Sequence, residues 1–186
     1  MSVSRLIEQY FEAGYKPIDL IHMGYAKSTV YTIYKRWIRR KMGENAIYIA
    51  YDIEPEVLEK FIIHLKTMGL NVHIGGITAE TLDRIEYASI VIAVIGRIPG
   101  FRRQLLHEEI NRAVKYNKPM IILIEEGTFI PMTLPPNAII LTFNRSNIRR
   151  TIEELISILK RRGREDPLFQ LIGVIAIALL ASLGVV

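Results

Sequence analysis

The sequence predicts an α/β fold built on a five-stranded parallel sheet, with a small helical module before it and an apolar segment after it. Three observations predict this arrangement. Between residues 44 and 163, short apolar runs rich in β-branched residues alternate with amphipathic helical patterns. Residues 1–43 hold eight Lys and Arg against three Asp and Glu, so they carry the whole formal net charge of +5. Residues 167–186 contain no charged side chain.

Composition excludes several classes of protein. The chain has no cysteine, which rules out a disulfide-stapled secreted domain, a thiolate metal site and a cysteine nucleophile. The first residues, MSVSRLIEQYFEAGY, form no apolar core of a signal peptide, so we expect none to be cleaved. A basic module joined to a neutral remainder is typical of a protein in which one module meets a polyanion.

The sequence of the basic module predicts three helices. Apolar residues at helical spacing predict a helix over 3–13, and Pro17 suits the first turn of a second helix that ends at His22. Gly24 can take a positive φ in the following turn, and Lys27 or Ser28 opens a third helix that reaches about Lys41. Helix, glycine-containing turn and helix make the helix-turn-helix plan.

The segment GYAKSTVYTIYKRW resembles the recognition half of resolvase-type helix-turn-helix domains, and the resemblance covers residues 16–38. A helical wheel turns Val30, Ile33, Tyr34 and Trp37 inward. The side chains left to face DNA phosphates and base edges are Lys27, Ser28, Thr32, Lys35 and Arg39. The alternative is a small helical bundle whose solvated basic face contacts protein.

The central segment predicts a flavodoxin-like parallel sheet of strand order 2-1-3-4-5. The expected strands are 46–52, 71–74, 89–96, 119–124 and 138–143, and the expected helices are 54–68, 78–88, 104–116 and 147–162. Such sheets bind ligands beyond the carboxyl ends of strands 1 and 3. The residues expected at that site are Tyr51, Asp52, Gly75, Gly76, Gly96 and Arg97.

Residues 45–162 resemble a Toll/interleukin-1 receptor (TIR) domain. The resemblance is carried by AIYIAYD, GLNVHIGG, DRIEYASIVIAVIG and HEEINRAVKYNKPMIILI. It implies NAD or a related nucleotide as ligand, cleavage of the bond between nicotinamide and ribose, and sites completed by self-association into a homo-oligomer. The neighbouring possibility is the nucleoside 2-deoxyribosyltransferase-like group, whose sheet and third helix look similar.

Glu109 is the candidate catalytic residue. Leu106, Ile110, Ala113 and Val114 define the expected buried arc of its helix, with Glu109 at the edge of the arc and Glu108 nearly opposite. Glu109 also aligns with the glutamate on which nicotinamide-cleaving TIR enzymes depend. A carboxylate there would stabilise the oxocarbenium-like ribose as charge develops. The alternative is a solvated glutamate paired with Arg112 or Arg102.

No cofactor or metal is expected, and NAD enters only as a candidate substrate. The four histidines show no metal-ligand spacing, and the sequence has neither a P-loop nor a GxGxxG that opens a helix. ATP hydrolysis and hydride transfer therefore have no support.

Residues 167–186 are long enough to cross a bilayer as a helix. The basic stretch KRRGRED precedes them, so the positive-inside rule predicts a single-pass tail anchor with the other domains facing the cytoplasm. The alternative is a buried helix of the main domain.

Two functions follow from these features. The first is a tail-anchored NAD glycohydrolase that carries a DNA-binding helix-turn-helix. The second is a membrane-tethered DNA-binding regulator whose α/β domain senses a nucleotide or oligomerises without catalysis.

Overall fold

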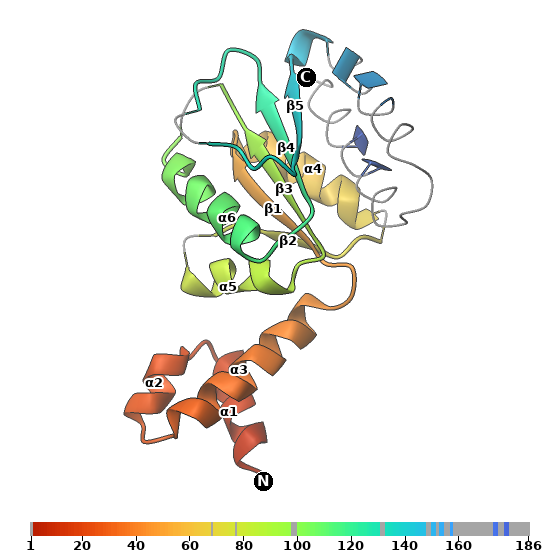
Figure 1. Cartoon of the computed structure of the whole chain (residues 1–186). Coiled ribbons are helices and arrows are strands. Elements are labelled where there is room, and N and C mark those ends of the chain that lie inside the picture. Colours follow the sequence, from red (N-terminus) through yellow and green to blue (C-terminus); the bar gives the residue numbers. More distant parts are fainter. Residues whose placement is uncertain are drawn as a thin grey trace. The chain divides into compact units, whose positions relative to one another are not determined.

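A computed structural model divides the chain into two compact units, Met1–Gly43 and Glu44–Val186 (Figure 1). The structure describes residues 2–67, 69–76, 78–97, 100–130, 133–147, 150, 151, 153, 154, 157, 173, 174, 177 and 178. The boundary falls at Gly43, where the expected domain boundary lies.

The first unit has three helices, α1 (Val3–Glu12), α2 (Pro17–His22) and α3 (Lys27–Met42). Glycines end α1 and α2: Gly14 has φ 91° and Gly24 has φ 96°, values that a residue without a side chain adopts at little cost. The predicted helices are confirmed to within a residue or two. The longest helix, α3, supplies most of the apolar core of this unit.

Aromatic side chains join α1 to α3. Phe11 packs edge-on against Tyr34, with ring centroids 5.2 Å apart, and also contacts Trp37 at 5.4 Å. The Trp37 indole N–H donates to Glu12 Oε1 at 2.7 Å, so the polar edge of the ring is satisfied. These contacts fix the roll of α3 and thereby select which of its residues face outward.

The second unit is a parallel sheet of order β2-β1-β3-β4-β5, which confirms the expected topology. Its strands are β1 (Ile47–Asp52), β2 (Val72–Ile74), β3 (Ile90–Ile95), β4 (Met120–Glu125) and β5 (Ile139–Phe143). Every residue of β3 is buried, as expected for a central strand covered on both faces.

Helices cover the two faces of this sheet (Figure 1). On one face, α4 (Pro55–Thr67) packs Leu58, Ile62 and Leu65 into the main apolar cluster. The helices α5 (Ala79–Tyr87) and α6 (Arg103–Lys115) lie on the other face. This placement brings the start of α6 to the carboxyl ends of β1 and β3.

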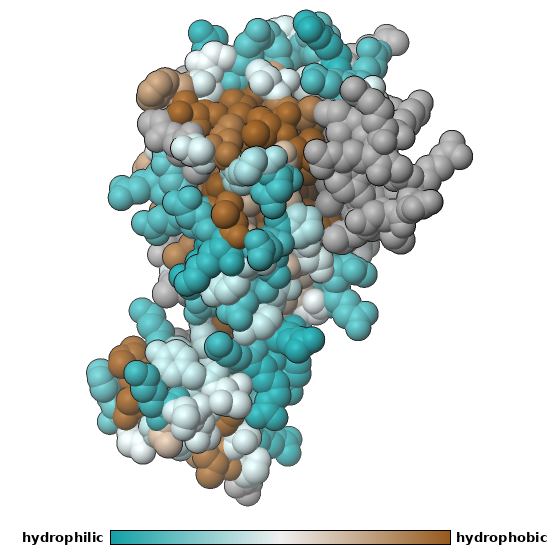
Figure 2. All heavy atoms as spheres, in the orientation of Figure 1, coloured by the Kyte–Doolittle hydropathy of each residue, from teal (hydrophilic) through white to brown (hydrophobic). Residues whose placement is uncertain are grey.

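The connection from β4 to β5 has no helix among its described residues, 126–130 and 133–138. Alternate residues of β5 are therefore exposed on the α5 and α6 face, and Ile140 is 40 % exposed. Figure 2 shows apolar side chains gathered over β4 and β5 on this face.

The expected helix 147–162 and the apolar segment 167–186 lie largely outside the described residues. Arg145–Asn147 forms a 3-10 turn, and residues 150, 151, 153, 154 and 157 are helical. Of the apolar segment, Ala178 is 9 % exposed and belongs to the main apolar cluster. Within the described part of the chain, no helix is both long and apolar enough to span a bilayer.

Candidate functional site

The predicted DNA-facing residues of α3 are all exposed. Lys27, Ser28, Thr32, Lys35 and Arg39 lie on the outer surface of the helix, whereas Val30, Ile33, Tyr34 and Trp37 are buried as the wheel requires. The Thr32 hydroxyl donates to the Ser28 carbonyl at 2.8 Å, so Thr32 would meet DNA through the lone pairs of its oxygen.

Two further cations of α3 have partners on α1. Arg40 pairs with Glu8 at 2.6 Å, and Lys41 pairs with Glu12 at 3.3 Å while its ammonium lies 4.1 Å from the centre of the Trp37 ring. These pairs orient the end of α3. Of the exposed cations in the middle of α3, Lys35, Arg36 and Arg39 have no ion pair to a described residue.

In the α/β unit, a cavity of about 480 Å³ opens at the carboxyl ends of the strands. It is lined by residues 51–55, which form the end of β1 and the segment after it, and by residues around the start of α6, together with Gly96, Arg97, Glu125 and Arg145. Four of the six predicted ligand-binding residues, Tyr51, Asp52, Gly96 and Arg97, line it. The other two, Gly75 and Gly76, do not.

Asp52 accepts hydrogen bonds from residues that precede and begin α6. Both of its carboxylate oxygens accept from the Gly100 N–H, at 3.2 and 3.1 Å, and Oδ2 accepts from Arg103 Nε at 2.5 Å. Arg103 also donates to the Gly96 carbonyl at 2.7 Å. Gly100 must be glycine at this approach because a Cβ would stand 2.5 Å from Asp52 Oδ1. The start of α6 is therefore held closely against the end of β1.

A second ionic group lies across the cavity. Arg145 donates to Glu54 Oε2 at 2.7 Å and to Glu125 Oε2 at 3.1 Å, and the hydrogen bond from Arg145 lowers the pKa of Glu54. Glu125 also accepts from the Arg97 backbone N–H at 2.8 Å. Within the described residues, the Arg97 guanidinium has no carboxylate partner, so it is available to an anionic ligand without displacing an ion pair.

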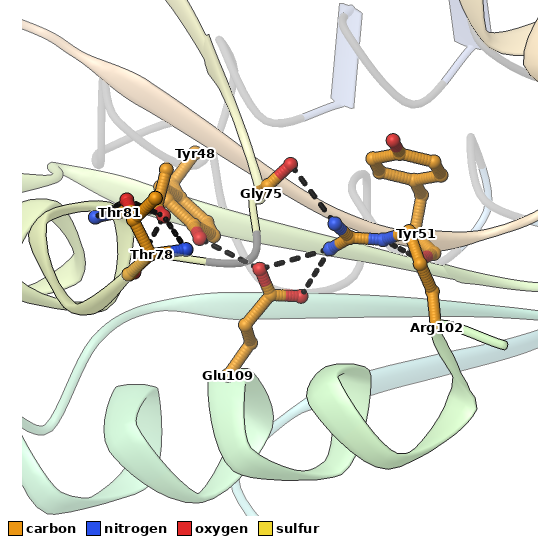
Figure 3. A network of polar contacts seen from close by, with 7 residues as sticks. All are labelled: Tyr48, Tyr51, Gly75, Thr78, Thr81, Arg102 and Glu109. Carbon is orange, nitrogen blue, oxygen red and sulfur yellow. Dashed lines mark hydrogen bonds and ion pairs between the residues drawn. The ribbon is translucent and has the colours of Figure 1, made fainter.

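Glu109 lies behind the wall of the cavity and does not line it. Its carboxylate is fully buried and accepts from the Tyr48 hydroxyl at 2.7 Å and from Arg102 Nη2 at 3.1 Å (Figure 3). Burial raises the pKa of Glu109, although both hydrogen bonds act in the opposite direction. The same burial, with the nearby carboxylate, raises the pKa of Tyr48.

Arg102 separates Glu109 from the cavity. Its guanidinium donates through Nε to the Tyr51 carbonyl at 3.1 Å, through Nη1 to the Gly75 carbonyl at 3.2 Å and through Nη2 to both oxygens of Glu109. It also lies 4.1 Å from the centre of the Tyr51 ring. Of the two partners expected for a non-catalytic Glu109, the structure selects Arg102, whereas Arg112 pairs with Asp83 at 2.7 Å.

Two details of the predicted helix phase are wrong. Glu109 lies within the buried arc and is not solvated, whereas Val114, expected in that arc, is 43 % exposed. The arc is centred between Leu106 and Ala113, which places Val114 past its edge. Glu108 is exposed, as predicted.

Gly75 and Gly76 make room for side chains of the α5 and α6 face. A Cβ on Gly75 would clash with Glu109 Oε1 and stand 2.7 Å from Arg102 Nη2, and one on Gly76 would stand 2.9 Å from Thr81 Cγ2. The two glycines follow β2, where the sequence places them, but they do not line the cavity: Gly75 leaves room for the buried ion pair of Arg102 and Glu109, and Gly76 for Thr81.

Sequence reasoning missed eight residues that line the cavity: Ile53, Glu54, Pro55, Gly100, Phe101, Arg102, Glu125 and Arg145. Glu125 ends β4, and Arg145 follows β5 by two residues. The rule that parallel strands end at one edge of a sheet could have found both. The conformation that carries Phe101 and Arg102 depends on the Asp52 contacts, which no spacing in the sequence reveals.

Among the described residues, no group of three or more His, Asp or Glu side chains is placed to hold a metal ion. Comparisons with known protein families, with curated proteins and with solved structures found no match to this chain. The function is therefore argued from the geometry of the two units.

Proposed function

We propose that this chain is a DNA-binding regulator whose α/β unit binds a nucleotide in the cavity at the strand ends. The observation that carries the proposal is the chemistry of that cavity, which combines carboxylates, a cation without an ionic partner and an exposed aromatic ring at the expected ligand position of a parallel sheet.

Each part of a nucleotide has a suitable partner in this cavity. Phe101 is 85 % exposed and offers a ring on which a base can stack. The carboxylates Glu54 and Glu125 can accept hydrogen bonds from ribose hydroxyls. Arg97 offers its guanidinium to a phosphate. The volume, about 480 Å³, lies within the range of small-molecule sites.

Calorimetric titration of the full chain in detergent with AMP and with NAD tests this proposal. Phe101→Ala should weaken AMP binding by roughly 10-fold, the value of one stacking contact. Phe129→Ala is the matched control, because Phe129 is 79 % exposed but lies outside the cavity lining. Absence of binding for both nucleotides, or equal losses in the two variants, would contradict the proposal.

Cleavage of NAD by Glu109 is the second candidate function. It is favoured by the position of the Glu109 carboxylate, 3.1 Å from the Arg102 guanidinium that lines the cavity. Glu109 is fully buried, so it would meet a ribose only after Arg102 moves away. For this reason nucleotide binding ranks first and cleavage second.

Release of nicotinamide from NAD tests this second candidate. Glu109→Gln should reduce the rate at least ~100-fold because it removes the charge that would stabilise the transition state. Glu108→Gln should change little, since Glu108 is exposed. If the TIR-like sites are completed by a second copy, the rate should also rise when the chain is clustered on vesicles. No release by the clustered parent protein would leave binding as the function.

DNA binding by the first unit is supported by the outward face of α3, where Lys35 and Arg39 have no ion pair to a described residue. These cations suit phosphate, and the hydroxyls of Ser28 and Thr32 precede them on the same face. We also propose attachment to a membrane through residues 167–186, with both units in the cytoplasm. This part of the proposal rests on the sequence of the segment and of the basic stretch before it.

A further inference from the structure

Arg102 is the one member of the buried Tyr48, Arg102 and Glu109 group that also lines the cavity. Its side chain is 5 % exposed, and that of Glu109 is fully buried. Figure 3 shows the guanidinium between the Glu109 carboxylate and the Tyr51 ring. A ligand in the cavity and Glu109 therefore approach the same cation from opposite sides.

The hydrogen bonds of Arg102 leave it one unused donor. Its nitrogens donate to three neighbours, Nε to the Tyr51 carbonyl, Nη1 to the Gly75 carbonyl and Nη2 to the Glu109 carboxylate, and the second Nη1 hydrogen has no acceptor among the described residues. A phosphate needs at least two such donors for a bidentate contact. It can obtain the second by displacing the bonds to Glu109.

We propose that Arg102 binds the nucleotide phosphate together with Arg97 and that a bound nucleotide competes with Glu109 for Arg102. This inference rests on the proposed nucleotide function. It adds the identity of a phosphate-binding residue and a coupling between nucleotide binding and the protonation of Glu109. When Arg102 turns to the phosphate, Glu109 stays buried and loses the cation with which it pairs among the described residues. The carboxylate then takes up a proton from solvent, and the neutral acid keeps its hydrogen bond with Tyr48.

The other charged groups around Glu109 do not replace Arg102. Tyr48 faces it from β1 and supplies a hydroxyl, and Glu108 on α6 adds a repulsive charge. From α5, Arg84 acts on Tyr48 and is paired with Glu80 at 2.9 Å. His73 of β2 stands in register with Tyr48 and so faces the same side of the sheet. Among the described residues, Arg102 is the cation that stands at ion-pair distance from Glu109.

The direction of the coupling between nucleotide binding and proton uptake by Glu109 can be measured. Burial already holds the pKa of Glu109 above its ordinary value, and loss of Arg102 raises it further. Between these two pKa values, binding of AMP takes up one proton and the affinity falls about tenfold for each unit by which the pH rises. Adenosine lacks the phosphate and should bind without proton uptake.

The test is calorimetry of the full chain with AMP and adenosine in two cationic buffers of different ionisation enthalpy. Parent protein should take up a proton with AMP only. Glu109→Gln should abolish the uptake and strengthen AMP binding about tenfold at the upper end of the pH range, because Arg102 is no longer shared. Glu108→Gln should behave as the parent. Arg102→Gln added to Glu109→Gln should lower AMP affinity about tenfold or more relative to Glu109→Gln and leave adenosine affinity unchanged, because Arg97 alone then faces the phosphate.

The outcomes separate the two proposals. AMP binding without proton uptake and without an effect of Glu109→Gln would overturn the role of Arg102 and leave nucleotide binding intact. If neither AMP nor adenosine binds, the nucleotide cavity itself is wrong. The uptake measured on the parent protein needs no variant, so a variant that fails to fold does not prevent the test.

Discussion

Replacing Arg102 by methionine should destabilise the α/β unit strongly, and more at high pH than at low pH. The substitution keeps an unbranched side chain on the cavity wall but leaves Glu109, fully buried, without the cation that stands 3.1 Å from its carboxylate. Removal of one partner from a buried ion pair costs about 3–5 kcal/mol. Of the polar contacts now made by the carboxylate, the hydrogen bond from Tyr48 remains.

The dependence on pH follows from the direction of the pKa shift. The pKa of Glu109 in the folded state lies above its ordinary value of 4.5, and the loss of Arg102 moves it further upward. The folded state then binds more protons than the unfolded state. The stability of Arg102→Met is therefore highest below the unfolded pKa and is lost as the pH rises through the folded pKa. Adding Glu109→Gln should recover most of the loss and flatten the pH dependence.

Two probes separate the units in this experiment. The single tryptophan, Trp37, lies in α3, so its fluorescence follows unfolding of the first unit. Hydrogen exchange of the β1 and β3 amides follows the second unit. Protection of these strands should fall in Arg102→Met and return in the double variant, with no change in the tryptophan transition. If the single and double variants are equally protected at pH 8, the ion pair does not stabilise the unit and the reasoning fails.

Three further outcomes are expected. Lys35→Ala and Arg39→Ala should each weaken DNA binding with little dependence on sequence and lower the slope of log affinity against log salt by about one, whereas unchanged affinity in both would indicate a protein-contact surface. Deletion of residues 167–186 should release the chain from vesicles at any salt in flotation assays, and retention that only high salt reverses would assign binding to the basic stretch. Gly75→Ala should cost about 1–3 kcal/mol by hydrogen exchange, because its Cβ would stand 2.7 Å from Arg102 Nη2, and a neutral result would mean that the ion pair shifts freely.

The sequence predicted the strands and their order because their signals are local. The runs in β1, β3 and β4 are mostly apolar and rich in β-branched residues, with a carboxylate at the end of β1 and of β4, and helical patterns between them require parallel connections. The helix phase was also close, since a wheel needs only the spacing of Leu106, Ile110 and Ala113. These features depend on residues within one element and its neighbours.

The composition of the site was harder to predict because it depends on a loop. Asp52 holds Gly100 and Arg103, and that contact sets the start of α6 and the position of Arg102. A helical wheel predicts that the Glu109 side chain faces the interior, but it does not predict which residues the side chain contacts there. The pairing of Glu109 with Arg102, and its isolation from the cavity, follow from a contact between residues 51 positions apart.

The Arg102 and Glu109 pair is not explained by stability. Well-packed apolar residues in place of a buried ion pair usually leave stability unchanged or improve it, although loss of one partner is costly. The structure also gives space to this pair by having Gly75 beside it, where a Cβ would stand 2.9 Å from Glu109 Cδ. A pair that adds little net stability and requires a glycine neighbour is better explained by what Arg102 can do at the cavity wall. At that wall the Arg102 guanidinium is oriented by hydrogen bonds to the Tyr51 and Gly75 carbonyls, and its charge is balanced by Glu109. A phosphate can therefore replace Glu109 as its anionic partner, while Glu109 becomes neutral by taking up a proton.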